Sequence, residues 1–99
     1  MKVYISEEAQ KWFKQEMEAV PGDTIRFYVR YGGSSPLHEA FSLGMTKDAP
    51  FEPAVTVMHD EVMYFIEERD EWYFNGHDLY VDVQTNTNEL EYSYKKGAV

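Results

Sequence analysis

A glycine-rich corner is the part of this sequence best suited to binding a ligand. It reads Gly32-Gly33-Ser34-Ser35-Pro36 and follows a strand-like segment that contains Arg26 and Arg30. Consecutive glycine N–H groups can bind an anion and arginine adds positive charge, so Arg30, Gly32 and Gly33 form a candidate small-anion site. Two plainer interpretations compete with it. In the first, the corner is an ordinary turn. In the second, both arginines pair with carboxylates of a neighbouring strand.

The same corner contains Ser34 and Ser35, at a position where some enzymes place a nucleophile. The Gly-x-Ser-x-Gly motif is absent, and no histidine or aspartate stands where it would be recognisable as a partner. We therefore predict that the protein is not an enzyme.

Three histidines could in principle bind a metal ion: His38, His59 and His77. Their separation of about twenty residues matches no local ligand spacing, so exposed imidazoles are the favoured interpretation. A mixed site in which His38 or His77 joins Glu39 or Asp78 stays open, because nitrogen and oxygen ligands suit several divalent ions. His38 and His77 are thus the candidate metal ligands.

The composition excludes several classes of function. The 99 residues include no cysteine, which rules out disulfides, thiolate nucleophiles and cysteine-ligated iron–sulfur clusters, so no cofactor is predicted. Eighteen acidic and nine basic residues give a net charge of -9, which argues against nucleic acid or an anionic membrane as the main partner. The partners that remain possible on this argument are another protein or, in a homodimer, a second copy of the chain. No apolar run approaches the roughly 18 residues of a membrane span, and we expect a cytoplasmic protein.

The periodicity predicts a single, mostly β (α+β) domain over residues 1–99. An N-cap serine and two glutamates, Ser6-Glu7-Glu8, begin an amphipathic helix that reaches Pro21. Alternating runs predict strands at 2–5, 25–31, 37–45, 54–59, 62–66, 78–83 and 90–94.

A short helix or turn is predicted for residues 67–74. Its acidic run, from Glu67 to Glu71, is most simply solvated, whereas Trp72, Tyr73 and Phe74 are expected to anchor the core or an interface. Asn75-Gly76 then supplies the backbone freedom that ends the segment.

Five short segments together resemble the HesB-type domain of the A-type iron–sulfur carriers. They are Ile5–Ala9, Val29–Pro36, Phe41, Val62–Glu67 and Trp72–Gly76. The similarity spans about Val3 to Val83 and is strongest to the cysteine-free branch of small bacterial proteins. It implies a compact β-sandwich or pseudobarrel of short mixed strands, with one N-terminal amphipathic helix.

The chain departs from that family at the residues that carry its chemistry. Ser34 stands at the position of the family's corner cysteine and Pro36 at that of the following glycine. A serine hydroxyl stays protonated near neutral pH and is a poor substitute for a thiolate ligand. The resemblance thus implies a non-enzymatic accessory or binding protein related to iron–sulfur assembly but without cluster ligands. A divalent-metal binder and a small-anion binder are the alternatives.

Overall fold

The computed structural model describes residues 1–97, which form seven strands and two helices. The helices are α1 (Glu7–Glu16) and a 3-10 helix, η1 (Glu68–Phe74). The strands are β1 (Val3–Ile5), β2 (Thr24–Tyr31), β3 (Phe41–Lys47), β4 (Pro53–His59), β5 (Val62–Glu67), β6 (His77–Gln84) and β7 (Glu89–Lys96). The predicted mostly β fold with two short helices is confirmed.

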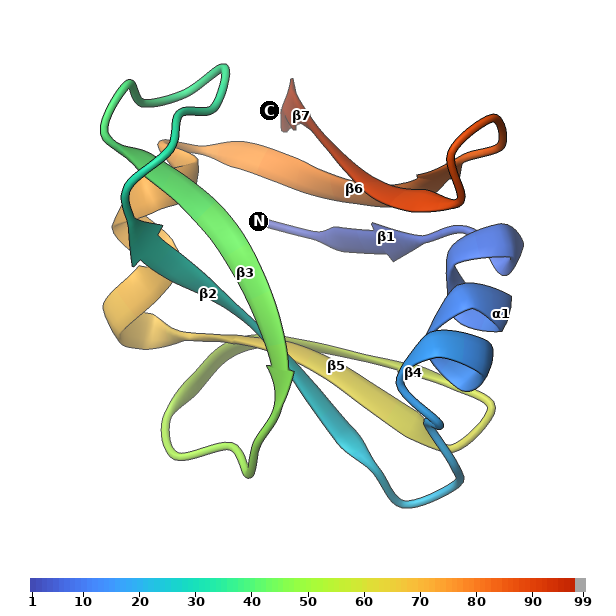
Figure 1. Ribbon diagram of the computed structural model, residues 1–99. Coiled ribbons are helices and arrows are strands. Elements are labelled where there is room, and N and C mark those ends of the chain that lie inside the picture. The colour runs from blue at the N-terminus through green and yellow to red at the C-terminus, as the bar shows by residue number, and fades with distance from the viewer. Residues whose placement is uncertain (98–99) are drawn as a thin grey trace.

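The strands form two mixed sheets that face each other. One sheet has the order β1-β6-β7 and the other β3-β2-β5-β4, with β1-β6 and β2-β5 paired in parallel and the other pairs antiparallel. In Figure 1, α1 lies at one end of the two sheets and η1 at the opposite end. The arrangement is the compact sandwich of short mixed strands that the sequence predicts.

The core lies between the sheets and under α1. Phe13 of α1 is fully buried and its ring centroid lies 5.2 Å from that of Tyr64 and 6.1 Å from that of Phe27. Ile25 and Phe27 on β2 follow the predicted alternation and are both fully buried. Burial of rings of this size supplies a large share of the apolar free energy of folding.

The helix begins as predicted and ends earlier. The Ser6 hydroxyl accepts the Ala9 N–H at 3.0 Å, and Glu7 and Glu8 fall in the first turn. The helix ends at Glu16 rather than near Pro21. Glu18 takes a positive φ of 53°, a left-handed conformation that stops the helical hydrogen-bond pattern.

No helix within residues 1–97 has both the length and the apolar composition that crossing a membrane would need.

Candidate functional site

The glycine corner is a tight connection between β2 and β3. Gly32 and Gly33 have φ values of 121° and 66°, which side chains other than glycine rarely adopt. The Gly32 N–H donates to the Ala40 carbonyl at 2.8 Å, and the Ser42 hydroxyl donates to the Gly32 carbonyl at 3.0 Å. The Gly32 N–H is therefore used inside the fold rather than offered to a ligand.

The second arm of the corner is a loop where the sequence predicts a strand. The predicted strand begins at residue 37, whereas β3 begins at Phe41. The Ser35 hydroxyl accepts the N–H groups of Leu37 and His38, both at 3.2 Å, and so bends the chain. Ser34, the residue singled out by sequence, is exposed and lies outside this turn.

Two of the three histidines make structural hydrogen bonds. His38 Nε2–H donates to the Tyr73 carbonyl at 2.9 Å and joins the corner to η1, while His77 Nδ1–H donates to the Phe74 carbonyl at 2.9 Å. His59 is the last residue of β4, and its ring lies 6.1 Å from that of Tyr64. Within residues 1–97 no three His, Asp or Glu side chains come together as a metal site. Tertiary packing thus directs a ring nitrogen of His38 and of His77 to a main-chain carbonyl.

Three aromatic side chains gather where the corner meets η1, and we call Tyr31, Phe41 and Trp72 the aromatic patch. The Phe41 ring lies 5.6 Å from Tyr31 and 5.3 Å from Trp72, at interplanar angles of 80° and 85°. Edge-to-face contacts of this kind are favourable for aromatic rings. Tyr31 is 86% exposed and Trp72 53% exposed, so the patch presents ring surface to solvent.

Helix η1 is held firmly beneath the patch. Tyr73 is fully buried, and its hydroxyl lies 3.1 Å from that of Tyr94 on β7. Burial, together with this hydrogen bond, raises the pKa of Tyr94 above its ordinary value. Trp72 therefore projects from a segment whose neighbouring residue is fixed in the core.

The alternation that predicts the strand at 25–31 places Tyr31 on the same, buried face as Ile25 and Phe27. Trp72 is predicted to anchor the core or an interface. Exposure of Tyr31 contradicts the first prediction, because β2 runs past the edge of the core at its last residue. The available signal was the position of Tyr31 directly before two glycines, where the strand had to end.

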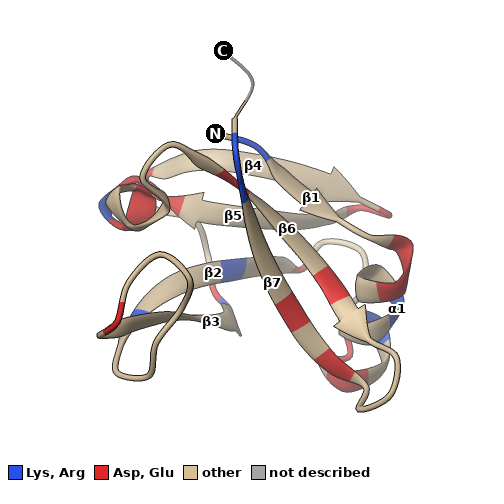
Figure 2. Cartoon of the chain, turned by 90° about the horizontal axis from the view of Figure 1, so that it is seen from above, with Lys and Arg blue, Asp and Glu red and all other residues tan. Residues whose placement is uncertain are grey.

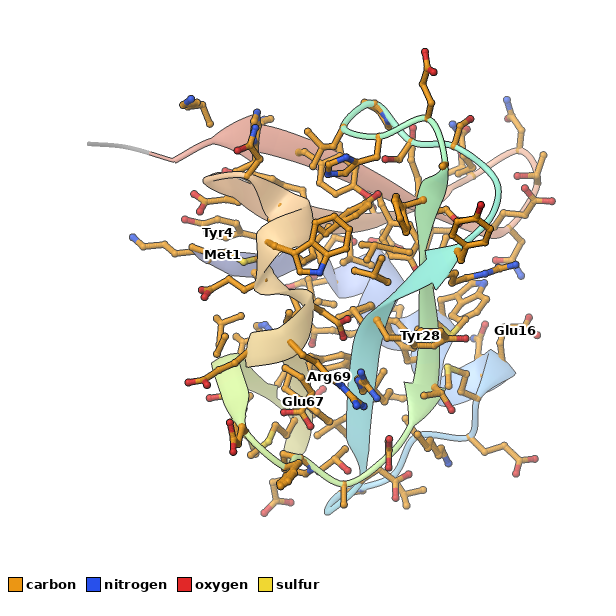
Figure 3. The ribbon with its side chains drawn as sticks, turned by 90° about the vertical axis from the view of Figure 1, so that its left-hand side faces the viewer. Met1, Tyr4, Glu16, Tyr28, Glu67 and Arg69 are labelled. Atoms are coloured by element: carbon orange, nitrogen blue, oxygen red, sulfur yellow. The ribbon has the colours of Figure 1, made fainter. Side chains whose placement is uncertain are left out.

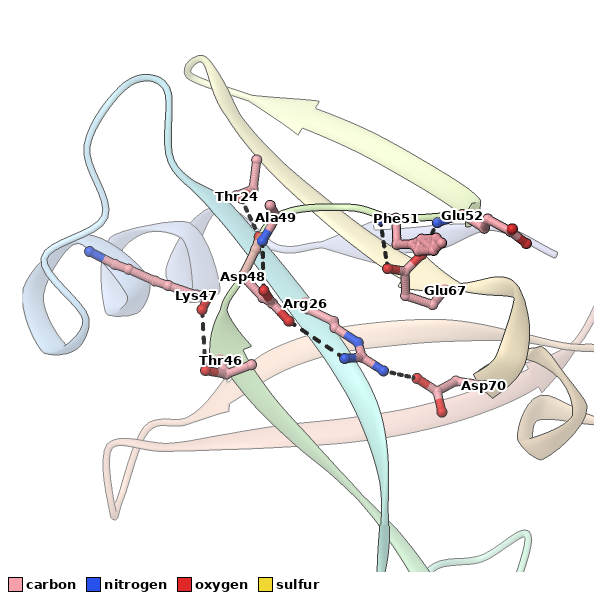
Figure 4. A network of polar contacts seen from close by, with 10 residues as sticks. All are labelled: Thr24, Arg26, Thr46, Lys47, Asp48, Ala49, Phe51, Glu52, Glu67 and Asp70. Atoms are coloured by element: carbon pink, nitrogen blue, oxygen red, sulfur yellow. Dashed lines mark hydrogen bonds and ion pairs between the residues drawn. The ribbon is translucent and has the colours of Figure 1, made fainter.

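The other face of the four-stranded sheet carries an ion-pair network (Figure 4). Arg26 lies 2.8 Å from an Asp70 carboxylate oxygen and 3.6 Å from one of Asp48, while Glu67 accepts the N–H groups of Phe51 and Glu52, both at 2.8 Å. Glu67 is 4% exposed and Asp70 8% exposed. The prediction that the acidic run is solvated is therefore wrong for these two residues, because the connection between β3 and β4 and the guanidinium group cover them.

Arg30 and Arg69 both turn away from the aromatic patch. The Arg30 Cδ lies over Gly44, 2.8 Å from where a Cβ would stand, and Gly44 pairs with Tyr28 toward the middle of the sheet. Arg69 lies beside Glu67 and lines a shallow concavity of about 230 Å³ with Phe51 and Glu52. Figure 3 shows Arg69 and Glu67 together on η1 and β5. Of the residues predicted for the anion site, Arg30 thus lies over Gly44 and the Gly32 N–H donates within the fold.

Acidic residues recur at the end of the molecule where α1 lies. Figure 2 marks Asp and Glu positions in red on α1 and on the parts of β6 and β7 nearest to it. Salt bridges within residues 1–97 use three of the nine basic residues of the chain: Lys14, Arg26 and Lys47. Most carboxylates therefore face solvent without an ion-pair partner in the described part of the chain.

Four carboxylates take part in these ion pairs within residues 1–97: Asp23, Asp48, Asp60 and Asp70. Arg26 contacts two carboxylates and the two lysines contact one each. The excess of negative charge at the surface therefore remains uncompensated over most of the described chain, which favours association with a positively charged partner.

Comparison with known proteins gives full-length relatives. No family model matches the chain. A Bacillus subtilis protein named "Pyruvate dehydrogenase inhibitor" is 45% identical over 95 residues, which cover 96% of this chain and 100% of the relative. Uncharacterized proteins of Staphylococcus saprophyticus and Staphylococcus aureus are 36% and 31% identical over 98 residues, with the same coverage of both chains.

These findings correct the functional predictions. The resemblance to the HesB-type domain is wrong, as is the predicted relation to iron–sulfur assembly, because the similarity covering the whole chain is to a protein named as an inhibitor. The metal-binding and anion-binding alternatives are set aside with it. Short strand, glycine and turn segments recur in many β folds, so the five matching segments carried little family information. The chain belongs to the family of the Bacillus subtilis pyruvate dehydrogenase inhibitor.

Proposed function

We propose that this protein binds pyruvate dehydrogenase and inhibits it. The observation that carries the proposal is the 45% identity to the Bacillus subtilis inhibitor along the full length of both chains. The alignment covers 96% of this chain and 100% of the relative, so the comparison is not limited to one segment. A shared surface is what a shared partner requires.

We further propose that the protein acts by occupying a surface of the enzyme and catalyses no reaction itself. The described residues offer exposed aromatic rings and uncompensated carboxylates, which are features of a binding surface. Inhibition by binding needs both proteins in one compartment, and we propose the cytoplasm for this chain, as the sequence predicts.

The test is inhibition of purified pyruvate dehydrogenase from the organism that encodes the chain, with the Bacillus subtilis enzyme as a second target. Activity is measured while the full-length protein is added in increasing amounts. We expect a saturable loss of activity and co-elution of the two proteins from a sizing column. Heat-denatured protein and an unrelated acidic protein of similar size serve as controls. Full activity at a large molar excess, without co-elution, would refute the proposal.

A further inference from the structure

We infer that the aromatic patch is the surface that contacts pyruvate dehydrogenase, and that it receives a segment of the enzyme carrying lysine or arginine side chains. The inference rests on the proposed function and adds to it the surface and the chemistry of the partner.

The exposed rings give the patch the composition of a binding hot spot. Tyrosine and tryptophan are enriched among residues that dominate the energy of interfaces, and here Tyr31 and Trp72 are 86% and 53% exposed. Both pack against Phe41, which is half-buried and joins the two rings into one continuous surface. A single exposed ring is common on protein surfaces, whereas two exposed rings joined through Phe41 form a larger apolar surface of the kind that marks an interaction site.

The patch is already ordered without a partner. The His38 Nε2–H bond to the Tyr73 carbonyl, at 2.9 Å, ties the loop after the glycine corner to η1. The imidazole also lies 5.4 Å from the Trp72 ring and 6.1 Å from the Phe41 ring. Because these contacts restrain the rings beforehand, binding loses less conformational entropy.

The charges around the patch favour a cationic partner. Glu39 and Glu71 are exposed and adjoin His38 and Trp72 in sequence, and neither forms an ion pair within residues 1–97. Arg30 and Arg69 turn toward the other side of the sheet, as described above. Ring faces attract ammonium and guanidinium groups, and nearby carboxylates strengthen that attraction.

The other exposed aromatic pair provides an internal contrast. Tyr4 stacks on Tyr80 at 4.6 Å, and Lys95 Nζ lies 4.6 Å from the Tyr80 ring centroid. That pair receives its cation from the chain itself. Within residues 1–97 no lysine or arginine lies over a ring of the aromatic patch, so its cation would come from another molecule.

The first arm of the test truncates the rings. Trp72→Ala and Tyr31→Ala are each expected to raise the protein concentration for half-inhibition of pyruvate dehydrogenase roughly 10- to 30-fold. Tyr4→Ala is the matched control and should inhibit like the wild-type protein. Circular dichroism and thermal unfolding establish that each variant is folded. Two folded patch variants that inhibit at wild-type concentrations would overturn the inference.

The second arm tests the charge of the partner. Inhibition by the wild-type protein should weaken as NaCl is raised from about 50 to about 300 mM, since salt screens exposed charges. The Glu39→Gln/Glu71→Gln variant should inhibit less at low salt and respond less to salt, whereas Glu89→Gln/Glu91→Gln, on β7, should retain the response. An equal loss of inhibition and an equal salt response in the two variants would overturn the inference that the partner segment is cationic.

The outcomes separate this inference from the proposed function. A wild-type protein that fails to inhibit refutes the proposed function, whereas inhibition that survives both ring truncations refutes only the assignment of the surface. If sedimentation shows a wild-type dimer that Trp72→Ala dissociates while inhibition is unchanged, the patch binds a second copy and the inference is also overturned.

Discussion

Arg26 and Asp70 form a nearly buried ion pair across 44 positions of the sequence. The guanidinium Nη2–H donates to Asp70 Oδ2 at 2.8 Å, and the two side chains are 12% and 11% exposed. The pair joins β2 to η1, the two elements that carry Tyr31 and Trp72. It therefore fixes the relative position of the two exposed rings of the aromatic patch.

Loss of one member of this pair should be costly. We expect Arg26→Met to lower the free energy of unfolding by about 3 kcal/mol, because the buried Asp70 carboxylate loses its partner, and Asp70→Asn to lower it by less, because Arg26 keeps Asp48 at 3.6 Å. The double variant Arg26→Met/Asp70→Asn should lose less than the sum of the single losses. Urea denaturation measures all three. Additive losses would show that the two side chains are not energetically coupled.

Gly44 should tolerate no side chain while Tyr28 is present. A Cβ at Gly44 would stand 2.6 Å from the Tyr28 Cζ, so the ring would have to move. We expect Gly44→Ala to destabilise the protein by about 1–3 kcal/mol. In a Tyr28→Ala/Arg30→Ala background, which also removes the Arg30 Cδ at 2.8 Å, the same substitution should cost much less. An equal cost in both backgrounds would assign the effect to the strand backbone instead.

Ser6 should contribute to stability through its helix cap. Its hydroxyl accepts the Ala9 N–H at 3.0 Å and donates to Asp82 on β6 at 2.8 Å. Ser6→Ala is expected to cost about 1 kcal/mol in thermal or urea unfolding. Ser93→Ala, at an exposed position of β7, is the control and should change stability by less than about 0.5 kcal/mol. Equal effects of the two substitutions would argue against the cap.

The protein should lose stability in strong alkali. Burial, with a smaller effect of Asp60, raises the pKa of Tyr64 from 10.0 to about 12. The contribution of Tyr64 is fully present below pH 10 and is lost as the pH rises through about 12, because the unfolded chain releases this proton first. Tyrosinate absorbance and circular dichroism, measured together, should show a step near pH 12 that Tyr64→Phe removes, whereas the ionisation of Tyr92 and Tyr94, whose pKa values burial also raises, remains. Ionisation of Tyr64 near pH 10 in the folded protein would contradict the expectation.

Local sequence signals predicted most of the elements. Ser6 followed by two glutamates located the start of α1, and the alternation of β2 located Ile25 and Phe27 in the core. Asn75 has a positive φ of 47° and ends η1, as its position before Gly76 predicts. These signals succeed because caps, turns and strand faces depend on residues only a few positions apart.

Local signals of this kind do not predict the proposed binding surface. The HesB-type resemblance rested on short segments, and it directed attention to Ser34 and the histidines. His38 serves instead to hold the corner against η1, through a hydrogen bond to a residue 35 positions away. Exposure of Tyr31 likewise depends on where the core ends, which strand periodicity does not specify.

By itself, the sequence determined the strand and helix order, the absence of thiolate chemistry and the acidic character of the protein. Only the tertiary structure decided that Tyr31, Phe41 and Trp72 share one surface and that Arg26 reaches Asp70. The physical reason is that side-chain types and short-range spacing set local conformation, whereas contacts between distant segments depend on how the two sheets and η1 pack around the shared core.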